Sequence, residues 1–287
     1  MSSRRPEKPR GGYKLLAVDL DGTLLDPFGE PHAEDLEAIA RADDAGIVVS
    51  IITGRLYSGT RPTAAKIGLE GPVACADGSH IVRAGDHTTL LHHGLRGESA
   101  DDLRATIGRA DLTTFLFAED TIVHDARGEE YLTYVRAWSS DIRSTIKVAE
   151  DELWKSALGI TAVVSLGTET EVLKTVDNIQ TNLNGVTQLT TFPVRRAADR
   201  WGMVVRAAGG TKGTALEWIA RHHGLSLSQA VCVGDWINDV PMLRVAGRSF
   251  AMGQAPPDVK AEATDVLCAT SLTGGGVAEA VATAFGL

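Results

Sequence analysis

The chain contains two short apolar runs of strand length, and each ends directly in a cluster of aspartates. Residues 14–18 (KLLAV) run into residues 19–23 (DLDGT), and residues 230–233 (AVCV) run into residues 234–239 (GDWIND). Buried parallel strands appear in a sequence as nearly continuous apolar runs, and ligands bind beyond the carboxyl ends of such strands. If the two strands are neighbours, we expect the two acidic clusters to meet at one edge of a parallel sheet.

The segments that follow the first cluster alternate between expected helices and strands. Residues 32–45 have helical spacing, and Gly46 follows as a stop signal. Residues 47–52 (IVVSII) are apolar on both faces, which is typical of a strand covered by helices on both sides. We expect the next helix at 56–67 and the next strand at 73–76. This order predicts an α/β architecture with a parallel sheet.

The same alternation returns near the end of the chain, around the second acidic cluster. The patterns predict helices at residues 214–223, 240–246, 257–263 and 277–285, and strands at 249–252 and 266–268. We therefore expect the C-terminal part to complete the sheet that the N-terminal part begins.

The middle of the chain is more polar, and its apolar residues more often alternate. The patterns predict strands at residues 114–117, 122–124, 186–192 and 201–207, and helices at 129–138 and 169–183. We expect an α+β domain at 85–206, inserted into a core domain made of 13–84 and 207–287. A short tail, 1–12, is expected to be disordered.

Length, charge and cysteine content limit the class of protein. The 287 residues suggest one large domain or two ordinary ones, at about 150 residues each. The formal net charge of −9 argues against a general nucleic-acid binder, which carries a basic surface. No apolar run spans a membrane, and the charged N-terminus is unlike a secretory signal. Cys75, Cys232 and Cys268 lie in apolar runs without a CxxC pair, so we expect buried, reduced thiols in a cytoplasmic protein.

The aspartates point to a metal ion. Asp19 and Asp21 lie two residues apart, so their side chains face the same side of an extended stretch. If Asp235 joins them, three carboxylates repel one another unless a cation lies between them. Oxygen ligands without His or Cys favour Mg²⁺. The alternative is that each aspartate only caps a turn or a helix, as Asp often does.

Two further residues are placed where an anion would bind. Thr53 and Gly54 follow the strand at 47–52, and Lys212 opens a helix after a glycine-rich stretch. Alternatively, Thr53 is a helix cap and Lys212 a solvated lysine. The glycine-rich stretch lacks the Gly-Lys pair of a Walker A loop, and no GxGxxG, HExxH or GxSxG pattern occurs. These absences exclude the common nucleotide, zinc-protease and serine-hydrolase motifs.

This set of motifs resembles the haloacid dehalogenase (HAD) superfamily, in particular its Cof-type phosphatases of subclass IIB. The DxDGT motif of that family matches residues 19–23, its strand-end threonine matches Thr53, its lysine matches Lys212, and its GDxxND motif matches residues 234–239. The resemblance runs from about residue 14 to the C-terminus. It implies a Rossmann-like core with an inserted α+β cap of the C2B type.

The resemblance also implies a reaction, the Mg²⁺-dependent hydrolysis of small phosphate monoesters. Asp19 would be the nucleophile that forms an aspartyl-phosphate, and Asp21 the general acid and base. Mg²⁺ would be held by Asp19, by Asp21 through its backbone carbonyl, and by Asp235. The phosphoryl oxygens would be fixed by Thr53 and Lys212, and the remaining substrate-binding residues would be Gly54, Arg55, Asn238 and Asp239.

Three departures from the family pattern bear on specificity. Trp236 replaces a small residue, Asp77 stands where Asn is frequent, and Gln254 stands where Asn often follows Met-Gly. Arg195, Arg196 and His124 are polar candidates for substrate contacts in the cap, although each is better explained as a surface residue. Family analogy favours sugar phosphates among small phosphorylated metabolites.

Two other functions fit the same motifs. A phosphotransferase or phosphomutase would pass the phosphoryl group from Asp19 to a sugar. A non-catalytic protein would only bind a phosphorylated ligand. The presence of both Asp19 and Asp21 favours an enzyme. The substrate, the cap residues that select it and the oligomeric state are not readable from the sequence.

Overall fold

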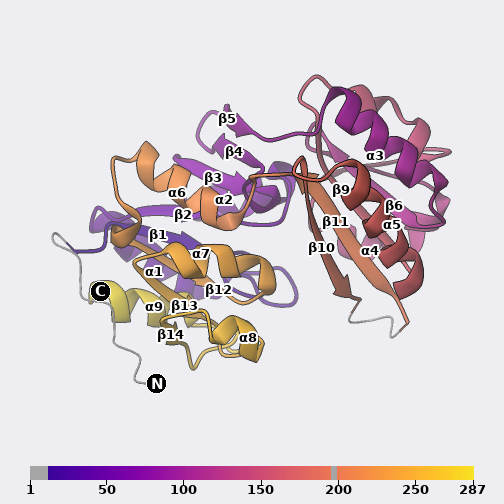
Figure 1. Ribbon diagram of the computed structural model, residues 1–287. Helices are drawn as coiled ribbons and strands as arrows, with labels where there is room; N and C mark the ends of the chain where they lie inside the picture. The colour runs from indigo at the N-terminus through magenta and orange to yellow at the C-terminus, as the bar shows by residue number, and fades with distance from the viewer. Residues whose placement is uncertain (1–11, 195–198) are drawn as a thin grey trace. The chain divides into compact units, whose positions relative to one another are not determined.

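The computed structural model describes residues 12–194 and 199–287, and it divides into two compact units (Figure 1). Unit 1 contains the described residues up to Gly54, together with Arg61–Leu90 and Thr211–Leu287. Unit 2 contains Arg55–Thr60 and the described residues of Leu91–Gly210. The inserted domain is predicted at 85–206, and all of the tail predicted at 1–12 except Gly12 lies outside the described residues.

Unit 1 is built on a five-stranded parallel sheet with the order β14-β13-β12-β1-β2. Its strands are β1 (Leu15–Val18), β2 (Val48–Ile51), β12 (Ala230–Gly234), β13 (Arg248–Ala251) and β14 (Asp265–Val266). Every residue of β1 and β12 is buried, which agrees with their unbroken apolar sequences. The two strands are neighbours, and Leu15 pairs with Ala230 and Val18 with Val233. The predicted α/β fold with a parallel sheet is therefore confirmed.

Helices cover the two faces of this sheet. They are α1 (Ala33–Asp44), α6 (Lys212–His222), α7 (Val240–Val245), α8 (Pro257–Lys260) and α9 (Gly276–Phe285). Helix α1 packs on α9, and α6 packs on α7. The chain leaves β1 toward β2 and leaves β12 in the opposite direction, toward β13. Right-handed crossovers in opposite directions place α1 and α7 on opposite faces of the sheet. The boundary between β1 and β12 is thus a topological switch point, where such sheets bind ligands.

One strand predicted for the parallel sheet lies instead in a second, small sheet in the N-terminal half. The strand expected at 73–76 is β3 (Pro72–Cys75), which pairs antiparallel with β4 (His80–Arg83). With β5 (Thr89–His92), these strands form a separate sheet of three. Strand β3 touches the main sheet through one parallel bridge, between Ile52 and Ala74. A 3-10 turn, Ala76–Gly78, joins β3 to β4, and helix α2 (Tyr57–Lys66) precedes β3 in the chain.

Unit 2 is an α+β structure with a six-stranded sheet of order β10-β11-β9-β6-β7-β8. The strands are β6 (Thr113–Ala118), β7 (Thr121–His124), β8 (Asp141–Ser144), β9 (Ile160–Gly167), β10 (Thr187–Pro193) and β11 (Trp201–Ala207). All neighbours are antiparallel except β7 and β8. Helices α3 (Gly97–Arg109) and α5 (Glu169–Asn182) enclose an apolar core with the sheet. Leu103, Leu116, Val163, Ile179 and Met203 belong to this core.

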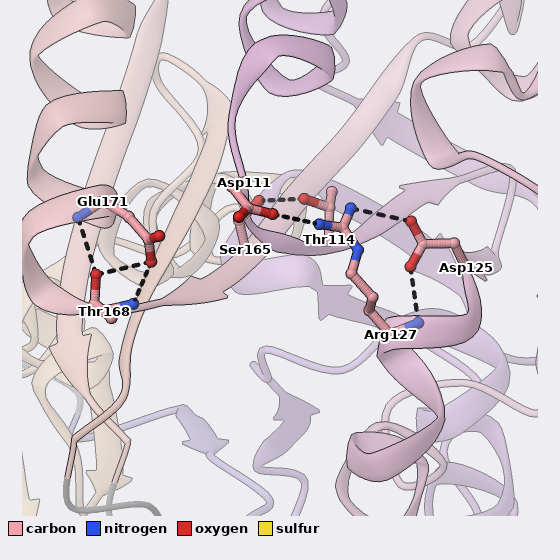
Figure 2. A network of polar contacts seen from close by, with 7 residues as sticks. All are labelled: Asp111, Thr114, Asp125, Arg127, Ser165, Thr168 and Glu171. Carbon is pink, nitrogen blue, oxygen red and sulfur yellow. Dashed lines mark hydrogen bonds and ion pairs between the residues drawn. The ribbon is translucent and has the colours of Figure 1, made fainter.

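Several polar groups of unit 2 are paired with one another (Figure 2). The buried hydroxyl groups of Thr114 and Ser165 lie 2.9 Å apart. Arg127 donates to the carboxylates of Asp111 and Asp125, at 3.3 and 3.2 Å. At the start of α5, Thr168 and Glu171 cap the helix reciprocally. Each of these groups therefore has a partner of complementary charge or hydrogen-bonding type.

The other differences from the sequence predictions also lie mainly in unit 2. The helix expected at 129–138 is wrong, because the chain forms a 3-10 segment, Ala126–Tyr131, followed by the single turn α4 (Leu132–Val135). Of residues 131–138 only Val135 is buried, so a longer helix would gain little from packing. No element was predicted for α3, β4, β5, β8 or β9, although β9 is buried along its whole length. Shorter 3-10 segments are Val148–Glu150, Glu152–Lys155, Leu227–Gln229 and Ile237–Asp239.

The cysteine prediction is correct for two residues and wrong for the third. Cys75 and Cys232 are buried, whereas Cys268 is exposed because it follows the short edge strand β14. His124 is buried beside Phe115, while Arg195 and Arg196 lie outside the described residues. Within 12–194 and 199–287, no helix has the length and apolar character needed to cross a bilayer.

Candidate functional site

The carboxyl ends of β1 and β12 bring the two acidic clusters together. The backbone N–H of Asp19 donates to the carbonyl of Val233 at 3.1 Å, so the strand pairing continues to the first residue of the DxDGT motif. One carboxylate oxygen from each of Asp19, Asp235 and Asp239 lies within 4.8 Å of the other two. Residues that are more than two hundred positions apart in sequence thus form one cluster, as the strand arrangement predicted.

Lys212 joins this cluster from the first turn of α6. Its Nζ donates to Oδ1 of Asp19 at 2.6 Å and to Oδ1 of Asp239 at 2.5 Å. The lysine side chain is only 1% exposed, so its hydrogen bonds are shielded from water. Thr211 caps α6 by accepting from the N–H of Thr214 at 3.1 Å, which fixes where the helix begins. The helix start therefore aims the ammonium group at the carboxylates.

Asp239 holds the loop that carries Asp235. Its Oδ2 accepts the backbone N–H groups of Asp235 and Trp236, both at 2.8 Å. A Cβ atom on Gly234 would lie 2.6 Å from Cγ of Asp239, so no side chain fits there. Because Lys212 and two N–H groups use both oxygens of Asp239, this carboxylate is better suited to holding the site together than to binding an ion.

Gly22 lets the DxDGT loop approach Asp235 closely. Its φ of +84° lies in the left-handed region that favours glycine. A Cβ at this position would lie 2.5 Å from Oδ2 of Asp235. The glycine in the first motif and the aspartate in the second are therefore in direct contact, which explains why these two residue types occur together.

The charges in the cluster do not balance. The cluster contains three carboxylates and one ammonium group, which contacts Asp19 and Asp239, so two formal negative charges are in excess. Burial, followed by repulsion from Asp239, raises the pKa of Asp19 well above its usual range, against the attraction of Lys212. Burial would lower the pKa of Lys212, but Asp19 and Asp239 outweigh it, and the pKa of Lys212 is raised. A single divalent cation would neutralise the excess charge, and the oxygen donors fit a hard ion.

A second group of contacts links the Thr53 loop to the GDxxND loop. The carbonyl of Thr53 accepts from the N–H of Asp77 at 2.9 Å, and Oδ1 of Asp77 accepts from Nδ2 of Asn238 at 2.8 Å. Ala76 and Asp77 have φ values of +48° and +53°, which are strained for residues with side chains. Such strain concentrates at functional sites. Asp77 also contributes to the raised pKa of Lys212.

The remaining predicted site residues differ in their exposure and in the unit to which they belong. Asp21 is exposed and directly precedes Gly22, and its carboxylate is outside the Asp19–Asp235–Asp239 group. Thr53 is fully buried, and a Cβ on Gly54 would lie 3.2 Å from Oδ1 of Asp77. Arg55 belongs to unit 2, where its Nη1 donates to the carbonyl of Gly59 at 3.3 Å. Trp236 is partly buried.

Two residues in this region were not among the predicted site residues. Asp77 contacts Asn238, and Gln254 contacts Gly22 and Asp235. Both had been noted only as departures from the family pattern. That departure was the one signal in the sequence, because neither residue lies in a recognisable motif.

A family model described as haloacid dehalogenase-like hydrolase matches residues 16–281. HMP-PP phosphatase of Serratia proteamaculans is 29% identical over 255 residues, which cover 86% of each protein. Pyridoxal phosphate phosphatase YbhA of Escherichia coli is 26% identical over 263 residues, covering 88% of this chain and 93% of YbhA.

Solved structures share the same fold. A haloacid dehalogenase-like hydrolase from Bacteroides thetaiotaomicron has a TM-score of 0.79 at 23% identity, covering 95% of this chain and all of that one (100%). The subclass IIB sugar phosphatase BT4131 has a TM-score of 0.71 at 22% identity, covering 88% of this chain and 92% of that one. At these identities the structural likeness supports the fold alone.

Proposed function

The chain belongs to the haloacid dehalogenase-like hydrolases, and on that premise we propose that its unit 1 site hydrolyses small phosphate monoesters with Mg²⁺ bound. The proposal rests on the convergence of Asp19, Asp235 and Asp239 at the ends of β1 and β12, where Lys212 donates to two of them. This arrangement raises the free energy of the folded protein, because it holds like charges together away from water. A bound divalent cation would relieve this repulsion, and the cation together with Lys212 would attract a phosphoryl group.

The metal ion would be held by Asp19 and Asp235, with the backbone carbonyl of Asp21 as a third ligand. Lys212 already donates to this carboxylate of Asp19, which would therefore be shared between the lysine and the ion. The bound ion would screen the negative charge of the phosphate and of the carboxylate that approaches it. Asp239 is assigned to Lys212 and to the loop backbone instead.

Asp19 would act as the nucleophile. A carboxylate oxygen of Asp19 forms a bond to phosphorus, and the bond from phosphorus to the leaving oxygen breaks. Asp21 gives its proton to that leaving oxygen. In the second half of the reaction Asp21 takes a proton from water, the water oxygen attacks phosphorus, and the bond to Asp19 breaks. Lys212 and Thr53 would hold the phosphoryl oxygens during both steps, with Gly54 and Asn238 also taking part in unit 1.

The relatives suggest which substrates to test first. Their names include phosphatases of HMP-PP, of pyridoxal phosphate and of sugar phosphates. We propose that the substrate of this chain is likewise a small phosphorylated metabolite, encountered in the cytoplasm. The departures at Asp77, Trp236 and Gln254 are close to the site and are expected to influence which of these compounds is preferred.

The experiment is a phosphate-release assay over p-nitrophenyl phosphate, HMP-PP, pyridoxal phosphate and a panel of sugar phosphates and nucleotides. We expect release in the presence of Mg²⁺ and little release after chelation with EDTA. Transfer of the phosphoryl group to an added sugar, without free phosphate, would instead favour a phosphotransferase. Binding of phosphorylated compounds without any turnover would show a non-catalytic protein and contradict the proposal.

A further inference from the structure

Gln254 is an exposed residue whose side-chain amide nevertheless makes hydrogen bonds at both ends. It lies in the loop between β13 and α8. Its Nε2 donates to the carbonyl of Gly22 at 2.5 Å and lies 3.4 Å from Oδ2 of Asp235. Its Oε1 accepts from the N–H of Ser271 at 3.1 Å. An exposed glutamine ordinarily keeps its rotamer freedom, and holding it in one rotamer costs side-chain entropy.

The orientation of this amide follows from its partners. The N–H of Ser271 can only donate, so it requires the oxygen of the amide, and the carbonyl of Gly22 can only accept, so it requires the nitrogen. The nitrogen is thereby also directed at Asp235. The amide group therefore presents a donor, and not an acceptor, to that carboxylate.

Gln254 is itself anchored to the body of unit 1. The carbonyl of Ser271 lies 3.0 Å from Nε2 of His32, the residue that precedes α1. A Cβ on Gly274 would lie 2.5 Å from the ring of His32, so this loop packs tightly on the start of α1. A continuous series of contacts thus runs from α1 through Ser271 and Gln254 to Asp235 and Gly22.

The two residues at the end of this series are those that frame the ion in the proposed function. Asp235 is a proposed ligand, and Gly22 directly follows Asp21, whose carbonyl is another. A donor on one carboxylate oxygen determines which oxygen faces the ion, and partners of this kind typically change metal affinity about 10–100-fold. A contact to the carbonyl of Gly22 also fixes the peptide that follows the Asp21 carbonyl.

We infer that Gln254 is a positioning residue for the divalent cation, which sets the orientation of Asp235 and of the Asp21-Gly22 backbone before the ion binds. This inference rests on the proposed function, because it requires the ion site. It assigns to Gln254 no contact with the phosphoryl group. Its effect is therefore expected in the affinity for Mg²⁺ more than in the rate of the loaded enzyme.

The test is a titration of the full chain with MgCl₂ alone, followed by calorimetry, for the wild type and for Gln254→Met. Methionine keeps the length of the side chain and removes both hydrogen-bonding ends. We expect the Kd for Mg²⁺ to rise about 10–100-fold, while the melting temperature without metal stays within a few degrees. The phosphate-release rate at saturating Mg²⁺ should fall by a smaller factor than the affinity. Gln180→Met, on the exposed face of α5 in unit 2, is the matched control and should bind Mg²⁺ as the wild type does.

The outcomes separate the two claims. If the wild type binds Mg²⁺ and Gln254→Met binds it equally well, the positioning role is wrong and the proposed function stands. An equal loss of affinity in Gln180→Met would also overturn the role, since the effect would not come from the site. A wild type that neither binds Mg²⁺ nor releases phosphate would overturn both. Gln254→Ala, which also removes the stem, should match Gln254→Met if the hydrogen bonds carry the effect.

Discussion

Units 1 and 2 bury charged side chains in opposite ways. In unit 2 each buried carboxylate has a cationic partner: Asp151 forms two hydrogen bonds with Arg143, at 2.9 and 2.8 Å, and Asp125 pairs with Arg127. In unit 1 Asp19 and Asp239 share the ammonium group of Lys212, and the carboxylate of Asp235 lies beside them. Balanced pairs maintain a fold, whereas an unbalanced cluster stores unfavourable energy that a ligand can relieve. The proposed location of the active site in unit 1 rests on this imbalance.

The largest expected effect is on activity and comes from Asp19→Asn in the unbalanced cluster. The amide keeps the shape but cannot attack phosphorus, so phosphate release should fall by roughly 10³-fold or more. The melting temperature should not drop, because the change removes one of the repelling charges. Steady-state assays and thermal unfolding measure the two effects.

Asp258→Asn, on the exposed surface of α8, is the control and should leave activity unchanged. Activity of Asp19→Asn close to that of the wild type would break the comparison, since the unbalanced charges would then have no catalytic role.

The next effect concerns the apolar interior of unit 2. Leu116→Ala removes a fully buried side chain from β6 and should lower the free energy of unfolding by about 2–5 kcal/mol. Urea unfolding measures this loss. Ile146→Ala, at a side chain that is 91% exposed, should change stability by less than about 0.5 kcal/mol. Equal effects from both variants would show that the unit 2 core is not packed as described.

A smaller but sharper test compares one carboxylate from each unit in metal-free buffer. Asp151→Asn leaves Arg143 without its anionic partner and should cost about 1–2 kcal/mol, because Arg143 is partly exposed. Asp235→Asn relieves repulsion and should leave the protein at least as stable as the wild type. Chemical unfolding after EDTA treatment measures both. If Asp235→Asn were the more destabilising variant, the account of unit 1 as an unbalanced site would be wrong.

The smallest expected effect is a pH dependence in unit 2. Burial, followed by repulsion from Arg96, lowers the pKa of His92, whose Nε2 lies 3.1 Å from Oγ1 of Thr161. Above about pH 6.5 the ring is neutral in both the folded and unfolded states. Below that pH the unfolded chain takes up a proton that the folded chain resists, so stability falls as the pH falls.

His92→Gln should remove this part of the pH dependence of stability, which unfolding experiments between about pH 5 and about pH 7.5 would show. An unchanged slope would mean that His92 is not the group responsible.

The strands that carry the site could be predicted from the sequence, and those of unit 2 only in part. Strands β1 and β12 are continuous apolar runs that end in aspartates, and this pattern predicted both strands. It predicted the meeting of Asp19 with Asp235 on the condition that the strands are neighbours, which the structure shows. Strand β9 is also buried on both faces, but it was not predicted. It lies in a region where polar and apolar residues mostly alternate, and no motif follows it. The helix predicted at 129–138 is wrong because most residues with helical spacing there are not buried against other parts of the protein.

The contacts that surround the site could not be read from local patterns. Asn238 reaches Asp77 across 161 positions, and Gln254 reaches Gly22 across 232. Side chains so far apart in sequence meet only because the sheet places their loops side by side. A single sequence contains the residue types of these contacts but not their pairing.

The central claim is that Asp19 takes the phosphoryl group before water does, and the steric course at phosphorus tests it most directly. The substrate is an ester whose phosphorus is made chiral with oxygen isotopes and sulfur, hydrolysed in the presence of Mg²⁺. Two successive in-line displacements, first by Asp19 and then by water, each invert phosphorus, so the account predicts net retention of configuration. Net inversion would mean that water attacks directly, and it would contradict the nucleophilic role of Asp19.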